Sequence, residues 1–315
     1  MNRHLFLLLL PLLLISPPQT EAIGEDYDLA GSLNNAQQLI LQAKKLTSNS
    51  QERSDNLQSS LSLLQACYDN RNAVSTNTLI SNRYRLFNAL RSLAFTSIET
   101  GPKDISNPLF VDVERLCQQF ADDVNMPDKI REAGYSTWSA LAAERADRKT
   151  VLEILDTMLK AHPEDKLEIG HAFLNIAEYS EQLTIEDCDR QRREGNKYPP
   201  TSPYEDQAFA IYEALSNKMP DSRVLAEARR HKADLHIKNQ KLDNAIEEYE
   251  AIVSMEAIPE DWKVYSRDNI GHICTLKGDY DSAIKWYKSI IDKHPGLTGS
   301  HPSASSKIRK LKGLK

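Results

Sequence analysis

The stretch from Val264 to Pro295 reads VYSRDNIGHICTLKGDYDSAIKWYKSIIDKHP, and it contains two helical patterns on either side of a turn at Gly278. Apolar and small residues recur every three or four positions in both halves, which places them on one face of each helix. Each half carries a small residue, Gly271 or Ala283, that lets the two backbones approach, and Tyr287 fills the space beside them. The stretch therefore predicts a helix-turn-helix unit.

This unit resembles the tetratricopeptide repeat, a helix-turn-helix of about 34 residues. Ile270-Gly271 matches the family's Leu-Gly pair, and Ala283 matches the small residue of its second helix. Arg267 stands at the family's Trp position, and Cys274 at its first Tyr position. The resemblance implies an all-α, right-handed α-solenoid, in which stacked helix pairs bury a continuous core and leave a concave face open.

Parts of the same pattern recur earlier in the chain, where Ile169-Gly170-His171 repeats as Ile270-Gly271-His272. Second helices that pair an alanine with a tyrosine four residues later recur as Ala208 with Tyr212, Ala245 with Tyr249, and Ala283 with Tyr287. We therefore predict TPR-like repeats over residues 164–295. Residues 181–203 are interpreted as an insertion between the helix that holds Gly170 and its partner helix. The alternatives for the insertion are a solvated surface loop, a lid over the groove or a docking element.

Residues 23–163 show helical periodicity with little repeat signature, and we interpret them as degenerate helix pairs or as a helical cap. Their apolar residues recur at helical spacing, for example at Leu29, Leu33, Ala36, Ile40 and Ala43. Residues 296–315 predict a linker and a short basic helix from Pro302 to Leu314. Ile308, Leu311 and Leu314 would lie on one side of that helix and cover the last repeat. Its basic side chains are either merely solvated or touch anionic lipid or nucleic acid.

The N-terminus has the features of an export signal. Arg3 precedes an apolar run from Leu5 to Ile15, which is too short to span a bilayer, and Thr20-Glu21-Ala22 offers a cleavage site. We predict that residues 1–22 are a signal peptide and that the protein is periplasmic or secreted, with no stable membrane span. The alternative is a retained N-terminal anchor.

Composition narrows the classes of partner. The chain of 315 residues has a net charge of −6, so as a whole it lacks the basic balance of a nucleic-acid-binding protein. The four cysteines, Cys67, Cys117, Cys188 and Cys274, are either thiols or form one disulfide.

Recognised catalytic motifs are absent from the sequence, so we predict no catalytic residue, no metal, no cofactor and no enzymatic activity. His231 and His236 are five positions apart and would point in different directions on a helix.

The resemblance also suggests candidate binding residues, because the family turns fixed positions of its first helices toward the groove. At those positions this chain has His171, Arg230, Asp234, Asp268 and His272. Some family members carry a two-carboxylate clamp of Lys and Asn at these positions, and that clamp is not reproduced here.

The sequence thus predicts an exported scaffold or adaptor that holds a protein or peptide segment in a concave groove, alone or as a homo-oligomer, in the assembly of a cell-envelope complex. Two alternatives remain open. One is an enzyme or accessory domain that acts on a polysaccharide or peptidoglycan. The other is a small-ligand binder with the insertion as its lid.

Overall fold

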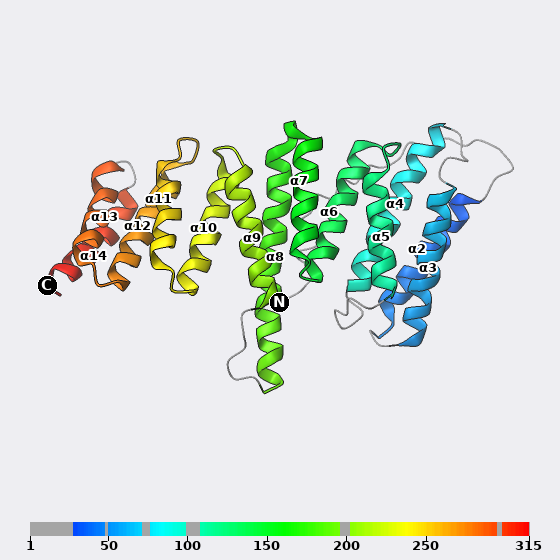
Figure 1. The fold of residues 1–315 in the computed structure, drawn as a ribbon, viewed down its shortest axis with the longest axis horizontal. Helices are drawn as coiled ribbons and strands as arrows, with labels where there is room; N and C mark the ends of the chain where they lie inside the picture. Colours follow the sequence, from blue (N-terminus) through cyan, green and yellow to red (C-terminus); the bar gives the residue numbers. More distant parts are fainter. Residues whose placement is uncertain are drawn as a thin grey trace. The chain divides into compact units, whose positions relative to one another are not determined.

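The computed structural model describes residues 28–47, 50–70, 76–98, 108–195, 202–294 and 298–314 (Figure 1). All regular structure in these ranges is helical, which confirms the predicted all-α class. None of the helices in the described ranges has both the length and the apolar composition of a membrane span. The predicted signal peptide, residues 1–22, lies outside them.

The chain divides into two compact units, Met1–Ala161 and His162–Lys315. The predicted boundary after residue 163 lies close to this division. We call the two parts the N-terminal unit and the C-terminal unit and describe each by itself.

The N-terminal unit consists of helices that pack on their neighbours in the sequence. They are α2 (Leu29–Lys45), α3 (Gln51–Asp69), α4 (Thr76–Ile98), α5 (Pro108–Asp122), α6 (Asp128–Glu144) and α7 (Arg148–Ala161). The periodic apolar residues predicted for α2 are all buried, and those of α3 join them in one core.

The C-terminal unit consists of three helix pairs and a final helix. The pairs are α8 (Lys166–Arg193) with α9 (Pro203–Lys218), α10 (Arg223–Lys238) with α11 (Leu242–Ser254), and α12 (Glu260–Leu276) with α13 (Tyr280–Lys293). Each second helix also packs against the first helix of the next pair, and α13 packs against α14 (His301–Lys312). Short 3-10 turns, Pro163–Asp165 and Thr298–Ser300, precede α8 and α14. This sequential packing confirms a TPR-like arrangement of the unit.

Three hairpins use the same tight turn, with one residue in the left-handed backbone region. That residue is Gly278 between α12 and α13 (φ 75°), but Gln240 between α10 and α11 (φ 57°) and Ala146 between α6 and α7 (φ 55°). In each case the following backbone N–H donates to the carbonyl five residues earlier, at distances of 2.9, 2.8 and 3.0 Å respectively. The α6–α7 hairpin therefore shares the turn of the C-terminal repeats although its sequence shows little of their signature.

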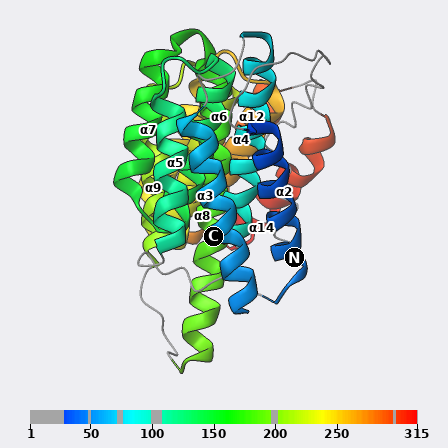
Figure 2. The same ribbon diagram turned by 90° about the vertical axis from the view of Figure 1, so that its right-hand side faces the viewer.

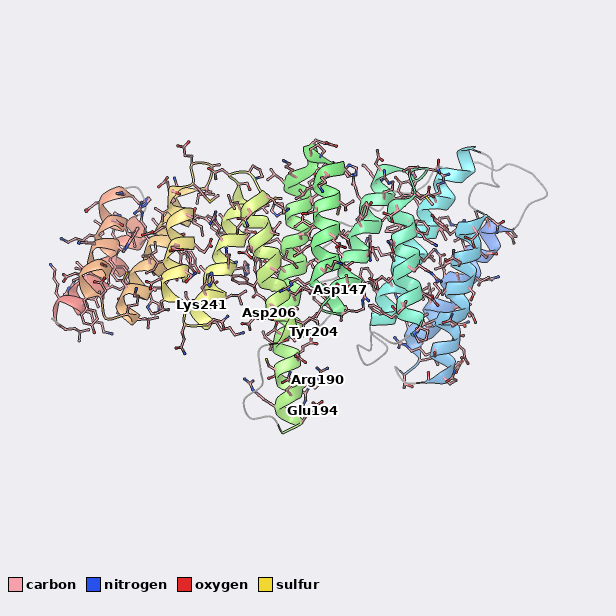
Figure 3. All side chains as sticks on the ribbon, in the orientation of Figure 1. Asp147, Arg190, Glu194, Tyr204, Asp206 and Lys241 are labelled. Atoms are coloured by element: carbon pink, nitrogen blue, oxygen red, sulfur yellow. The ribbon has the colours of Figure 1, made fainter. Side chains whose placement is uncertain are left out.

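The predicted insertion at residues 181–203 is wrong as a loop, because α8 continues to Arg193 as a single helix. Leu183, Thr184 and Asp187 are buried, so the first part of the segment belongs to the packed pair. Only the end of α8 projects past α9 and α10, as both views show (Figures 1 and 2). We call residues 188–195 the arm. In Figure 3 its residues Arg190 and Glu194 lie beyond Tyr204 and Asp206, which belong to the first turn of α9.

Asp187 links the start of the arm on α8 to the residue before α9. Its buried carboxylate accepts a hydrogen bond of 3.0 Å from the hydroxyl of Ser202, which is the residue before α9, and another of 3.1 Å from Gln191. Arg190 pairs with the same carboxylate. The chain thus returns to α8 at the point from which the arm departs.

Helix α14 covers α13 at the end of the unit. Ala304, Ile308 and Leu311 are buried, as the helical pattern of the tail predicted for the last two. Leu314 was expected on the same side, but it lies after the helix and remains 59% exposed.

Candidate functional site

Two second-helix tyrosines donate hydrogen bonds to carboxylates of their own first helices. The hydroxyl of Tyr212 lies 2.6 Å from Oε1 of Glu181, and that of Tyr249 lies 2.7 Å from Oδ1 of Asp234. Burial, followed by the nearby carboxylate, raises the pKa of both phenols. Both tyrosines therefore stay protonated and fix the position of an acidic side chain on the first helix.

These bonds show which residues occupy equivalent positions in the helix pairs. The partners are 15 residues apart in α10–α11 and 31 apart in α8–α9. The buried residue before Glu181 is Ser180, which accepts a 2.8 Å hydrogen bond from Gln207 of α9. In α12–α13 the residue 15 positions before Tyr287 is His272, so Gly271, which precedes it, takes the place that Ser180 has in the first pair.

The predicted match of Gly170 with Gly271 is accordingly not supported by the packing. A Cβ at Gly271 would lie 2.7 Å from Cε1 of Tyr287, the aromatic residue of the paired helix. A Cβ at Gly170 would instead meet Met219 at 2.6 Å and Val224 at 2.9 Å. The two glycines permit close approach to different neighbours, so His171 and His272 do not occupy equivalent positions.

His231 of α10 links two acidic residues of α8. Its Nε2 lies 3.2 Å from Oε1 of Glu178, and its Nδ1 lies 3.2 Å from Oε1 of Glu181. Its ring stacks on Tyr212, with ring centroids 5.0 Å apart and planes 11° from parallel. The sequence gives no local sign of this contact, because it joins residues of helices that are far apart along the chain.

The charge state of this cluster follows from its geometry. Burial acts to lower the pKa of His231, but hydrogen bonds to Glu178 and Glu181 outweigh it and raise the pKa to about 9. Arg230, whose Nη2 is 2.6 Å from Nε2 of His231, opposes the rise. Burial likewise acts to raise the pKa of Glu181, and hydrogen bonds from His231 and Tyr212 outweigh it and lower that pKa. An imidazolium between carboxylates therefore joins α10 to α8 at neutral pH.

The predicted groove residues are placed in different surroundings. Arg230 and Asp234 lie one turn apart on α10, with Nη1 and Oδ2 separated by 3.6 Å. Asp268 of α12 accepts hydrogen bonds of 2.6 and 2.8 Å from Lys307 of α14, whose Nζ lies 5.1 Å from the ring centroid of Tyr287. Asp234, through Tyr249, and Asp268, through Lys307, are thus part of contacts between helices, whereas Arg230 contacts Asp234 and His231 of its own helix.

His171 and His272 are exposed on α8 and α12. His272 lies on a line of exposed side chains along α12, between Tyr265 and Leu276, which are 45% and 56% exposed. At spacings of seven and four residues these three point in nearly the same direction over about 16 Å of helix. The sequence could have indicated this line, because an exposed aromatic and an exposed leucine at helical spacing depart from the buried pattern.

Arg267 explains one departure from the family motif. Its Nε donates a 3.1 Å hydrogen bond to His294, its Nη1 donates one of 3.2 Å to Ser289, and its guanidinium lies 5.7 Å from the ring centroid of Trp286. The second helix therefore supplies the indole here, and the arginine packs against it.

The other residues considered for metal or redox chemistry have separate surroundings. His236 is buried with its ring edge against Phe209, and burial lowers its pKa. His231 and His236 therefore have different partners, as their spacing predicted. The four cysteines are present as free thiols.

Comparison with known proteins supports the assignment of the last pair. Residues 264–292 match the family model of the tetratricopeptide repeat. The C-terminal unit is thus an array of paired helices, and α12 and α13 form a tetratricopeptide repeat within it. Among solved structures, the crystal structure of BtubC (BKLC) from P. vanneervenii is 14% identical, with a TM-score of 0.35, and the match covers 87% of this chain and 94% of that chain. The comparison with curated proteins finds no match.

Proposed function

We propose that the protein is an exported, non-catalytic scaffold that holds a protein or peptide segment along the first helices of the C-terminal unit during assembly of a cell-envelope complex. The observation that carries the proposal is the exposed line of Tyr265, His272 and Leu276 on the tetratricopeptide repeat itself. An aromatic ring, an imidazole and a leucine in one row provide apolar contact together with a hydrogen-bonding group. Such a row suits a segment that lies along the helix.

The contacts behind this row support binding without large rearrangement. The hydroxyl of Tyr249 is hydrogen-bonded to Asp234. The ring of Tyr249 packs against the ring of Tyr265, and their centroids are 6.3 Å apart. Tyr265 of the row therefore packs against a ring that a hydrogen bond already holds in position. A prepositioned surface loses less conformational entropy when a partner binds.

The double variant His272→Ala and Leu276→Ser tests the proposal. Proteins captured from the native envelope by the wild type would be identified by mass spectrometry, and the interacting segment would then be titrated against purified protein. We expect the double variant to weaken binding at least tenfold. Val124→Ser is a matched control, because Val124 is 77% exposed in the N-terminal unit.

Two outcomes would contradict the proposal. A segment that binds the double variant as tightly as the wild type would exclude this row as the site. A purified protein that binds a glycan, with capture of a protein partner absent, would favour the polysaccharide alternative. N-terminal sequencing of protein from the native source tests export separately, and the mature chain is expected to begin near Ile23.

A further inference from the structure

The C-terminal end of the chain has a charge opposite to that of the whole protein. From Lys293 to Lys315 there are six basic residues and no aspartate or glutamate, whereas the complete chain has a net charge of −6. Most of these residues lie on α14. The basic charge is thus concentrated at one end of the C-terminal unit.

Packing of α14 directs this charge outward. Ala304, Ile308 and Leu311 are buried, and Lys307 is paired with Asp268. Helical geometry then places Arg309 and Lys310 on the opposite side, where both are exposed. The buried side anchors the helix, and the basic side is available to a partner.

The outward cations are not neutralised by the protein. Within the described ranges, no residue forms an ion pair with Arg309, Lys310 or Lys312, although Lys307 of the same helix has one. Leu314 lies two residues after the end of the helix and is 59% exposed. Unpaired basic side chains are attracted to anionic headgroups, and an exposed leucine beside them adds apolar contact with the bilayer.

We propose that the outer face of α14, made of Arg309, Lys310 and Lys312 with Leu314 beside it, docks the C-terminal unit on an anionic phospholipid surface. A nucleic acid would also attract the cations, but it would gain nothing from the leucine. The proposal does not depend on the segment-binding row of α12.

The contribution of each group can be anticipated. One basic residue near an anionic membrane strengthens binding roughly fivefold, and the effect decays over a Debye length of about 8 Å at physiological salt. Three unpaired cations therefore predict roughly a hundredfold preference for anionic over neutral vesicles. Binding should weaken steeply as salt is added.

The test uses the full chain and two kinds of vesicle, one of phosphatidylcholine alone and one with added phosphatidylglycerol. Cosedimentation would compare the wild type with the double variant Arg309→Glu, Lys310→Glu. We expect the wild type to bind only the anionic vesicles and the variant to bind at least about 25-fold more weakly. Circular dichroism would verify that the variant, altered at two exposed residues, keeps its helices.

A matched control is available in the N-terminal unit, where Arg148 and Lys149 are also adjacent and exposed on a helix. Arg148→Glu, Lys149→Glu changes the net charge by the same amount and should leave vesicle binding within about twofold of the wild type. Equal loss in both variants would show that only net charge matters and would overturn the proposal. Absence of binding to anionic vesicles, equal binding to neutral ones, or tighter binding to a DNA duplex would overturn it as well.

Discussion

The hydroxyl of Tyr249 donates a 2.7 Å hydrogen bond to Oδ1 of Asp234, which joins the second helix of the middle pair to its first helix. Tyr249 is fully buried, whereas Asp234 is 47% exposed. The bond therefore connects the interior of the pair to the surface on which the predicted groove residues lie.

Removal of this bond should reduce stability. Tyr249→Phe is expected to lower the free energy of unfolding by about 1–2 kcal/mol, because a hydrogen bond to a partly solvated carboxylate is lost. Urea unfolding of Tyr249→Phe, Asp234→Ala and the double variant would measure the coupling, expected near 1 kcal/mol. Fully additive effects would show that the bond contributes nothing.

The close helix contact in the tetratricopeptide repeat makes a second prediction. Ala283 is fully buried, so Ala283→Trp should lower stability by about 1–3 kcal/mol or more through overpacking. Lys285 is exposed on the same helix, and Lys285→Trp should stay within about 0.5 kcal/mol of the wild type. Chemical denaturation of both variants tests the assigned faces, and equal losses would contradict the assignment.

The His231 cluster predicts a pH dependence. The folded pKa of about 9 exceeds the unfolded value of 6.5, so the stabilisation is complete below pH 6.5 and is lost as pH rises through 9. The loss should reach up to about 3 kcal/mol. The groups that face the ring are Glu178, Glu181, Tyr212 and Arg230.

Denaturation of the wild type and of His231→Gln across this pH range provides the measurement. The stability difference between the two proteins should be largest near pH 6.5 and should shrink toward pH 9. A constant difference over the whole range would mean that the imidazole is neutral in the folded protein.

Substitution of the turn residues in the left-handed backbone region should change the melting temperature. A non-glycine residue in this backbone region is strained by about 1 kcal/mol, so Ala146→Gly and Gln240→Gly should each raise the melting temperature. Gly278→Ala should lower it, since the glycine already has φ 75°. Calorimetry of the three variants tests whether the turns are equivalent. Stabilisation at Gln240 without stabilisation at Ala146 would show that they are not.

Shortening of the arm separates two parts of the segment first interpreted as one insertion. Replacement of residues 192–201 by a short turn keeps Arg190, Gln191 and Ser202 on Asp187 and should leave the melting temperature within a few degrees, because loop closure depends only weakly on length. Replacement of residues 181–201 also removes Leu183, Thr184 and Asp187, which are buried. That change should cost several kcal/mol, in the range of large core deletions. Similar melting curves for the two proteins would contradict the structure of α8.

The sequence predicted the second helices well because their contacts are local. Ala245 and Tyr249 are one turn apart and are both buried in the core. The same is true of Ala283 and Tyr287. A period of three and four residues is sufficient to identify such a face. The presence of α14 followed from the same pattern.

The alignment of α8 with α9 could not be predicted from the same periodicity. The tripeptide Ile169-Gly170-His171 repeats one that occurs in α12, but a helix as long as α8 offers several alignments to α9. The alignment is set by contacts of Ser180 and Glu181 with residues far along the chain. Polar residues at 186, 189 and 190 also conceal the helix that ends at Arg193, because an arm with little packing needs no apolar stripe.

The bond between Ser202 and Asp187 has a consequence for how the chain can change over generations. The bond ties the start of α9 to α8 at the base of the arm, so this contact needs nothing from residues 192–195 at the end of the arm. Residues added or removed at the tip leave the register of α8 and α9 unchanged. The tip is therefore a natural place for lineages to diverge in length, and for a reporter domain to be grafted between Glu194 and Ser202.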